Sequence, residues 1–134
     1  MSGESTRRVS AFAERLAATS ERQREFLTLA AEEEADPQWS QQMQDALAGS
    51  LRDHYGDKGG LEISEVRCTR SICAMSAVVS NPILSGQATD WQSLIGSVMG
   101  EPWFPQQFFD ASTTMGTDDD GMIYITYVVR KPSD

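Results

Sequence analysis

One stretch of the sequence sets the architecture: LEISEVRCTRSICAMSAVVS, residues 61–80. Its apolar residues recur at every second position, which is the period of a β-strand with one buried face. The phase of this alternation slips by one residue near Ser64-Glu65, which indicates a β-bulge. The first strand, 61–68, and the returning strand, 72–80, are separated by Thr69-Arg70-Ser71. The stretch therefore predicts an antiparallel β-hairpin.

The two cysteines of the chain, Cys68 and Cys73, flank the turn of this hairpin. Four residues lie between them, so a tight turn places their side chains opposite each other on one face. Facing residues of this kind are close enough for a disulfide bond. The alternative is a pair of reduced cysteines that pack as small hydrophobic side chains. The spacing is not C-x-x-C, so it does not indicate a thioredoxin-like redox role.

Helical spacing precedes the hairpin. Residues 6–35 are rich in good helix formers and predict a long N-terminal helix, with a break near Thr19-Ser20 as the alternative. Asp36-Pro37 has the pattern of an N-cap followed by proline at the first helical position. The next helix carries apolar residues at steps of four and stops at Gly56. These residues are Trp39, Met43, Leu47, Leu51 and Tyr55.

The second half of the chain repeats this change of period. Thr89-Asp90-Trp91-Gln92 has the spacing of a capping box and predicts a third helix that runs to about Met99. Strands follow at about 108–115 and 122–130, joined by a turn at Asp118-Asp119-Asp120-Gly121. The alternative for this acidic turn, an EF-hand calcium loop, lacks the alternating oxygen ligands and the final glutamate.

The predicted order of elements, α-α-β-β-α-β-β, defines an α+β protein. We expect a four-stranded antiparallel sheet with the helices packed on one face. An N-terminal helical segment, residues 1–35, and an α+β domain, residues 36–134, together form a single globular unit. A chain of 134 residues is long enough to bury a sizeable core without a metal or a disulfide.

The charge of the chain narrows the choice of partners. The net charge is −9, and its cations are scattered apart from Arg7-Arg8 and Arg130-Lys131. Binding to a phosphate backbone requires clustered Lys and Arg, so we expect no nucleic-acid partner. We also expect no insertion into a membrane, because no apolar stretch approaches about 20 residues. A protein partner fits the composition better.

The segment from Ile63 to Cys73 resembles the V-x-C-x-x-x-x-C hairpin of small proteobacterial envelope proteins and lipoproteins of uncharacterised function. In that group the hairpin follows a helix with a tryptophan near its start, and Trp39 has this position here. The resemblance covers residues 36–80 and implies an oxidising compartment. The chain shows no signal or lipobox cysteine, so the resemblance also implies that a leader has been removed. We expect a periplasmic or envelope-associated protein in that case, and a cytoplasmic one otherwise.

Trp103 and Phe104, between two prolines, are the candidate protein-binding residues. Prolines order a loop in advance, and large aromatic side chains dominate the energetics of interfaces. The alternative is that both rings turn inward and cap the core of the sheet. The long N-terminal helix offers a second surface, since it could pack on the domain, pair with another copy in a homodimer, or lead to an anchor.

Catalytic candidates are few. His54 is the only histidine, and its partners would be Asp53, Asp57 or a distant carboxylate. A solvent-facing histidine near the C-terminal end of a helix is the alternative. No nucleophile elbow is present. One histidine and one cysteine pair do not complete a zinc site, so we expect no catalytic residue, no metal and no cofactor.

These observations lead to a non-enzymatic protein-binding or accessory domain of the bacterial envelope. One alternative is an immunity or inhibitor protein that neutralises a basic toxin or enzyme through its negative surface. The other is an enzyme that uses His54.

Overall fold

The computed structural model describes residues 3–55, 61–79, 87–119 and 121–132, except for the side chains of residues 4 and 87–90. It confirms an α+β protein with a four-stranded antiparallel sheet, in the strand order β1-β2-β4-β3. The elements in chain order are α1 (Gly3–Thr19), α2 (Glu21–Glu32), α3 (Trp39–Tyr55), β1 (Leu61–Cys68), β2 (Ile72–Val79), α4 (Gln87–Met99), α5 (Phe104–Gln107), β3 (Phe108–Asp118) and β4 (Gly121–Arg130).

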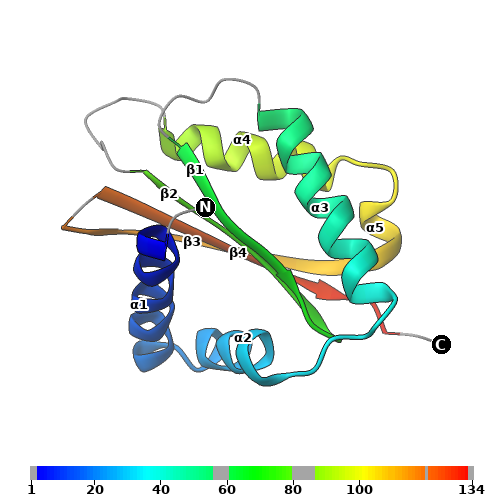
Figure 1. Cartoon of the computed structure of the whole chain (residues 1–134), viewed down its shortest axis with the longest axis horizontal. Coiled ribbons are helices and arrows are strands. Elements are labelled where there is room, and N and C mark those ends of the chain that lie inside the picture. Colours follow the sequence, from blue (N-terminus) through cyan, green and yellow to red (C-terminus); the bar gives the residue numbers. More distant parts are fainter. Residues whose placement is uncertain (1–2, 56–60, 80–86, 120, 133–134) are drawn as a thin grey trace.

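The helices cover both faces of the sheet, so the expectation that they pack on one face is wrong. Figure 1 shows α1 and α2 on one side of the sheet and α3, α4 and α5 on the other. The reason lies in the central strands β2 and β4, which are apolar at almost every position rather than at alternate ones. Such strands bury side chains on both faces, and each face then needs a covering layer.

The face under α3, α4 and α5 holds the larger core. Trp91 of α4 is fully buried there, its indole N–H donates to Thr126 Oγ1 at 3.1 Å, and its ring stacks on Tyr124. The members of this core include Met43, Leu47, Leu51, Met75, Val79, Leu94, Val98, Phe104, Phe108 and Val128.

The face under α1 and α2 holds a smaller core. The predicted long helix breaks at Ser20, whose side chain accepts a hydrogen bond from the Gln23 N–H and caps α2. The alternative of a break near Thr19-Ser20 is thus confirmed. A straight helix over residues 6–35 would be about 45 Å long and would carry its apolar stripe past the sheet. The core residues on this face are Phe12, Ala13, Phe26, Ile72, Val78, Ile123, Ile125 and Tyr127.

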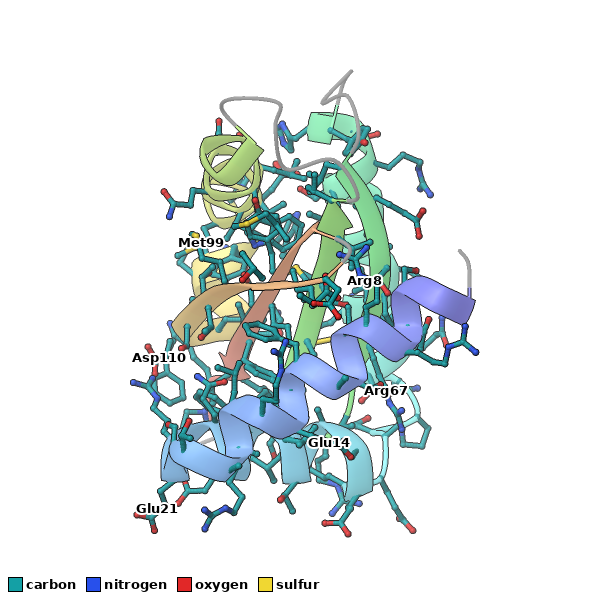
Figure 2. All side chains as sticks on the ribbon, turned by 90° about the vertical axis from the view of Figure 1, so that its left-hand side faces the viewer. Arg8, Glu14, Glu21, Arg67, Met99 and Asp110 are labelled. Atoms are coloured by element: carbon teal, nitrogen blue, oxygen red, sulfur yellow. A yellow bond between two sulfur atoms is a disulfide. The ribbon has the colours of Figure 1, made fainter. Side chains whose placement is uncertain are left out.

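Polar contacts attach α1 to the end of the β3–β4 hairpin. The buried Arg8 guanidinium donates to both carboxylate oxygens of Asp118, at 2.8 and 2.9 Å. Figure 2 shows Arg8 pointing from α1 toward the strands. Phe12 lies directly over Gly116 of β3, where a Cβ atom would come within 2.4 Å of the ring. The position therefore requires glycine, for a reason that the sequence does not reveal.

The details of the first hairpin agree with the sequence. The register of β1 against β2 shifts between Ile63 and Glu65, which confirms the predicted bulge.

The β3–β4 turn ends at Gly121, whose φ of 146° favours glycine. Gly56 and the side chain of Thr89, which were assigned a helix stop and a capping box, lie outside the described residues. No described helix is both long enough and apolar enough to cross a membrane.

Candidate binding surfaces

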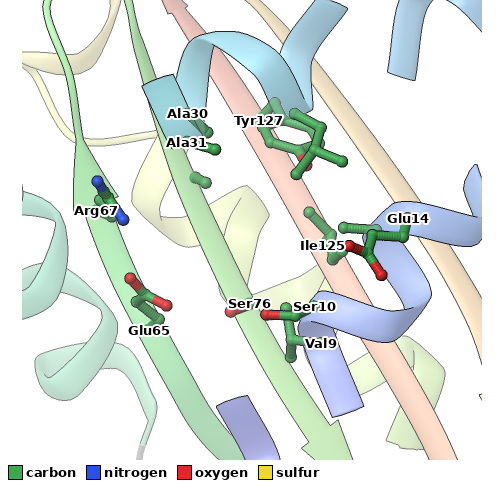
Figure 3. Close-up of a pocket in the computed structure, with 13 residues that line it drawn as sticks. Val9, Ser10, Glu14, Ala30, Ala31, Glu65, Arg67, Ser76, Ile125 and Tyr127 are labelled. Carbon is green, nitrogen blue, oxygen red and sulfur yellow. The ribbon is translucent and has the colours of Figure 1, made fainter. Parts of the chain in front are cut away.

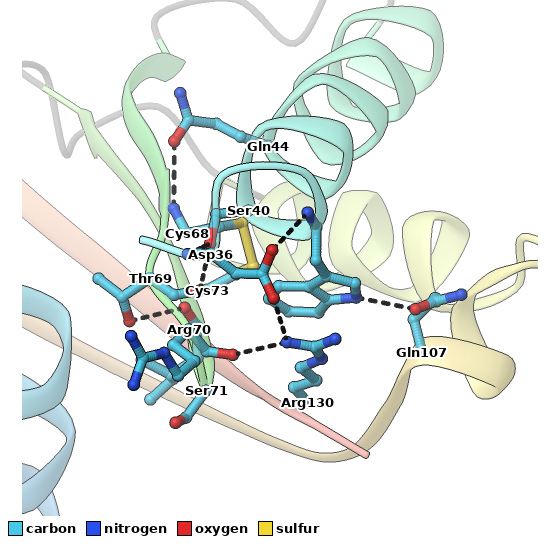
Figure 4. Close-up of a disulfide and its surroundings, with 12 residues drawn as sticks. Asp36, Ser40, Gln44, Cys68, Thr69, Arg70, Ser71, Cys73, Gln107 and Arg130 are labelled. Carbon is cyan, nitrogen blue, oxygen red and sulfur yellow. Dashed lines mark hydrogen bonds and ion pairs between the residues drawn. A yellow bond between two sulfur atoms is a disulfide. The ribbon is translucent and has the colours of Figure 1, made fainter. Parts of the chain in front are cut away.

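The disulfide lies at the closed end of the first hairpin. Cys68 and Cys73 are bonded to each other and face each other across β1 and β2. Both side chains are buried in the larger core. The predicted disulfide is therefore confirmed, and the two sulfurs belong to the interior rather than to a reactive surface (Figure 4).

The hairpin turn is tied to the end of α2 by one carboxylate. Glu33 accepts hydrogen bonds from the hydroxyl groups of Thr69 and Ser71 and from the Ser71 N–H, at 2.5–2.8 Å. Burial raises the pKa of this carboxyl, but the hydrogen bonds from Ser71 and Thr69 outweigh burial, so the net shift of the pKa is downward. Glu33, which belongs to the acidic run 32–34, therefore has a structural role: it holds the hairpin turn against the end of α2.

The start of α3 is tied to the same turn. The Ser40 hydroxyl donates to the Thr69 carbonyl at 2.6 Å, and the Gln44 side chain accepts from the Cys68 N–H at 3.2 Å. Asp36 caps α3 by accepting from the Trp39 N–H, as its sequence pattern predicts. This hydrogen bond, together with one from Arg130, lowers the pKa of the Asp36 carboxyl.

Arg130 completes the junction from the end of β4. Its guanidinium donates to Asp36 at 3.2 Å and lies 4.2 Å from the centre of the Trp39 ring. The Trp39 indole N–H donates in turn to the Gln107 side chain at 2.9 Å. The polar groups at this end of the molecule are therefore used to hold elements together.

His54 lies on α3 with a carboxylate partner that the sequence did not identify. Its Nε2 is 3.7 Å from Glu101 Oε2, and the Ser50 hydroxyl donates to the same oxygen at 2.9 Å. The carboxylate therefore stands between the serine and the histidine. In a Ser-His-acid triad the histidine stands in the middle and takes the serine proton. The cluster thus contains a serine, a histidine and an acid, but Ser50 contacts Glu101 and not His54. His54 is therefore not placed to take the proton of Ser50.

The two candidate protein-binding residues turn toward the core. Phe104 is buried, and its ring centre is 4.9 Å from that of Phe108. Trp103 is half-buried and packs against the same core. The inward alternative thus describes Phe104, and a role of either residue in protein binding stays a prediction.

A groove lies between α1, α2 and the sheet. Its volume is about 330 Å³, and Figure 3 shows Glu65 and Arg67 of β1 on one side and Glu14 of α1 on the other. Its floor is formed by small and apolar residues of the sheet and the two helices, including Ala13, Leu27, Ala30, Ala74, Ile125 and Tyr127. We call this the α1–α2 groove.

A second groove lies on the opposite face of the sheet, between α3 and β1. Its volume is about 510 Å³, and we call it the α3 groove. Glu65 lines both grooves, so they meet at the middle of β1. The residues that line the α3 groove are Gln44, Asp45, Ala48, Leu51, Arg52, Tyr55, Leu61, Ile63, Glu65 and Val66.

Strand β1 is an edge strand, since β2 is its only neighbour among the described strands. Side chains of α3 occupy the two ends of its outer edge: the Tyr55 hydroxyl donates to the Leu61 carbonyl, and Gln44 accepts from the Cys68 N–H. The stretch between these two contacts, residues 62–67, is flanked by a groove on each face.

Among the described residues, no group of three His, Cys, Asp or Glu side chains converges to hold a metal ion. In comparisons of the chain with protein-family models, curated proteins and solved structures, nothing matches. The resemblance to envelope proteins therefore stays a prediction.

Proposed function

We propose that this chain is a non-enzymatic protein-binding domain of the bacterial envelope that takes up an extended segment of a partner protein along β1. The observation that carries the proposal is the pair of grooves on opposite faces of one edge strand. Successive side chains of an added strand point to opposite faces of a sheet. In recognition by strand addition, main-chain hydrogen bonds supply affinity and pockets for alternate side chains supply specificity.

The length of the bound segment follows from the contacts at the ends of β1. Tyr55 and Gln44 occupy the edge at Leu61 and Cys68. The stretch 62–67 between them spans about 20 Å at the rise of a β-strand. A segment of about six residues would therefore pair with β1, with its side chains entering the two grooves alternately.

The charges at the grooves favour a basic segment. Glu14, Asp45 and Glu65 outnumber Arg52 and Arg67 in the two linings. The chain as a whole carries a net charge of −9. A segment with Lys or Arg between apolar residues matches both the apolar floors and the acidic excess.

Internal ion pairs leave this acidic excess unchanged, because each pair uses one arginine and one aspartate. Arg8, Arg22 and Arg130 each form an ion pair with an aspartate that is distant in the sequence. These cations hold the fold together, so they are not available to attract an acidic partner. The surface offered to a partner is accordingly dominated by carboxylates.

The non-enzymatic part of the proposal is supported by the geometry around His54. Glu101 separates His54 from Ser50, and the His54 side chain is 39% exposed to solvent. General-base catalysis requires the base to reach the proton that it abstracts. The envelope location is supported by the disulfide, since such bonds persist in oxidising compartments.

Binding of synthetic peptides tests the proposal. We expect ten-residue peptides in which apolar residues alternate with Lys to bind, as measured by fluorescence anisotropy. Scrambled peptides of the same composition, and peptides with proline at every second position, should bind at least about tenfold more weakly, since proline cannot donate to a strand ladder. Equal binding of all three sets would contradict strand addition.

Variants of the protein locate the binding site. Ala48→Phe fills the α3 groove and Ala31→Phe fills the α1–α2 groove, so each should weaken binding of the alternating peptide by about tenfold or more. Ala18→Phe is the matched control, because Ala18 is an exposed position on α1 that lines neither groove. If Ala18→Phe weakens binding as much as the two groove variants do, the proposed site is wrong.

The acidic excess also supports a second candidate function, an inhibitor or immunity protein that covers a basic toxin or enzyme. Such a complex would use a broad charged surface, and its affinity would fall steeply with added salt. A bulky side chain in either groove would leave such a complex intact. Salt titrations on the Ala48→Phe and Ala31→Phe variants therefore distinguish this function from segment binding.

A further inference from the structure

The opposite edge of the sheet points to a second copy of the chain. We propose that β3 pairs with β3 of another molecule in antiparallel register, so that two four-stranded sheets join into one eight-stranded sheet about a two-fold axis. This inference goes beyond the proposed function and does not depend on it, because the two edges lie on opposite sides of the sheet.

Strand β3 exposes large hydrophobic side chains to solvent. Of the three large hydrophobic side chains that are exposed among the described residues, two lie on this strand: Phe109 is 60% exposed and Met115 is 37% exposed. Thr113 and Thr117, on the same face as Met115, are exposed as well. The helices that cover β2 and β4 thus leave this part of β3 open.

The usual devices against edge pairing are missing from the middle of β3. Natural edge strands are protected by charged residues, prolines, bulges or covering elements. The stretch 111–117 contains no charged residue and no proline, and the bulge of β3 lies before it, between Phe108 and Asp110. At the far end of the stretch, Arg15 of α1 donates to the Thr117 carbonyl at 3.4 Å, so pairing at Thr117 must displace this hydrogen bond. Strand β1 differs from β3: its stretch 62–67 contains a bulge and three charged residues, and side chains of α3 occupy only its two ends.

The charge of β3 is what favours a second copy over another partner. Two molecules with a net charge of −9 repel each other. On β3, however, the two carboxylates are already paired: Asp110 with Arg22 at 2.7 Å and Asp118 with Arg8 at 2.8 Å. This edge is therefore locally neutral, and identical neutral edges can meet without bringing unpaired like charges together.

A two-fold axis at Thr114 gives a self-complementary register. It sets Asp110 opposite Asp118 of the second copy and Thr113 opposite Met115 of the second copy. The two aspartates would each bring their own arginine, so the charges at both ends of the paired strands alternate in sign. Thr114 would face Thr114 of the second copy, a cross-strand pair that stabilises sheets. Such a contact is isologous and closes after two copies.

Sedimentation equilibrium tests the proposal. We expect the mass to rise with concentration from the 14.8 kDa of one chain to twice that value. Added salt should strengthen the dimer, because it screens the repulsion between two acidic molecules, with a screening length that falls from about 30 Å at 0.01 M to about 10 Å at 0.1 M. A chain that stays monomeric up to about 1 mM, the weakest range of specific association, would overturn the proposal.

Two variants and one control place the interface. Met115→Lys should raise the dissociation constant at least about tenfold, because a lysine on the edge must be desolvated on pairing. Gln42→Lys adds the same charge at an exposed position on α3, outside the proposed interface, and should leave the dimer unchanged or slightly tighter. A dimer that both variants affect equally would show that β3 is not its interface.

Phe109→Lys repeats the test at a side chain that is 60% exposed, so the fold should tolerate it. Circular dichroism checks that each variant is folded. Amide hydrogen exchange provides a measurement without any substitution: the amides of 111–117 should exchange more slowly as the concentration rises, while those of 62–67 on β1 should not change. The opposite pattern would count against β3.

Discussion

The two faces of the sheet are covered in different ways. Under α3, α4 and α5 the side chains interlock, with Leu47, Trp91 and Val98 almost completely removed from solvent. Under α1 and α2 the core is smaller, arginines of the helices bind the strands, and a groove of about 330 Å³ remains. One face therefore supplies most of the hydrophobic stabilisation, and the other keeps space in which a ligand can be accommodated.

The largest expected effect comes from making the same leucine-to-alanine change on each face of the sheet. Leu47→Ala, in the interlocked face, should lower the free energy of unfolding by about 3 kcal/mol, because the surroundings cannot close the cavity. Leu27→Ala, at a half-buried position that lines the α1–α2 groove, should cost about 1 kcal/mol, since the site is already open. Urea unfolding measures both. Equal losses would mean that the two faces do not differ in this way.

The next effect concerns the disulfide at the end of the interlocked face. Reduction of the Cys68–Cys73 bond should lower stability by about 2 kcal/mol, because it closes only a short loop in the unfolded chain. The hairpin turn should keep its position, since Glu33, Ser40 and Arg130 also hold it. Unfolding with and without a phosphine reductant measures the change, and circular dichroism follows the fold. Complete unfolding on reduction at neutral pH would contradict the expectation.

A smaller effect tests the contact between α1 and β3 on the other face. Gly116→Ala should cost about 1.5 kcal/mol, because the added methyl group collides with the Phe12 ring. In a Phe12→Ala background the same change should cost close to nothing, since the ring is gone and glycine is a poor strand residue. The two free-energy differences form a double-mutant cycle. A cost that is the same in both backgrounds would place its cause elsewhere.

The smallest effect is a dependence on pH. The pKa values of Glu33 and Asp36 are lowered in the folded protein from ordinary values of 4.5 and 3.8. Their contribution is therefore complete above about pH 4.5 and is lost as the pH falls through the lower folded values. Glu33→Gln should flatten the decline of stability below pH 4.5, measured by thermal unfolding between neutral and acidic pH.

Glu32→Gln provides the control for this measurement. It removes the same charge at an exposed position one residue away and should leave the acid profile nearly unchanged. An identical flattening in both variants would show that the effect comes from net charge and not from the hydrogen bonds to the hairpin turn.

Much of the fold could be predicted because its signals are local. The change from helical to alternating spacing located β1 and β2, the slip in phase located the bulge, and the spacing of Cys68 and Cys73 gave the disulfide. Each of these depends on residues within a few positions of one another, where backbone geometry leaves few choices. The single domain organisation and the envelope location remain predictions.

The covering of the second face could not be predicted in the same way. The near-continuous apolar run of β4 did indicate a strand buried on both sides, and that signal could have corrected the expected arrangement of helices. Nothing in the sequence shows that Arg8 meets Asp118 or that His54 meets Glu101, because these pairs are separated by 110 and 47 positions. The grooves were missed for the same reason, since their linings come from several separate elements.

The local order of residues was thus enough to specify the helices, the strands, the hairpin bulge and the sulfur bridge. The assignment of helices to faces, the contacts of α3 with the two ends of β1, the exposure of β3 and the two grooves arose when distant segments packed together. Backbone conformation and side-chain spacing act over a few residues, whereas burial and charge pairing depend on which surfaces meet in three dimensions.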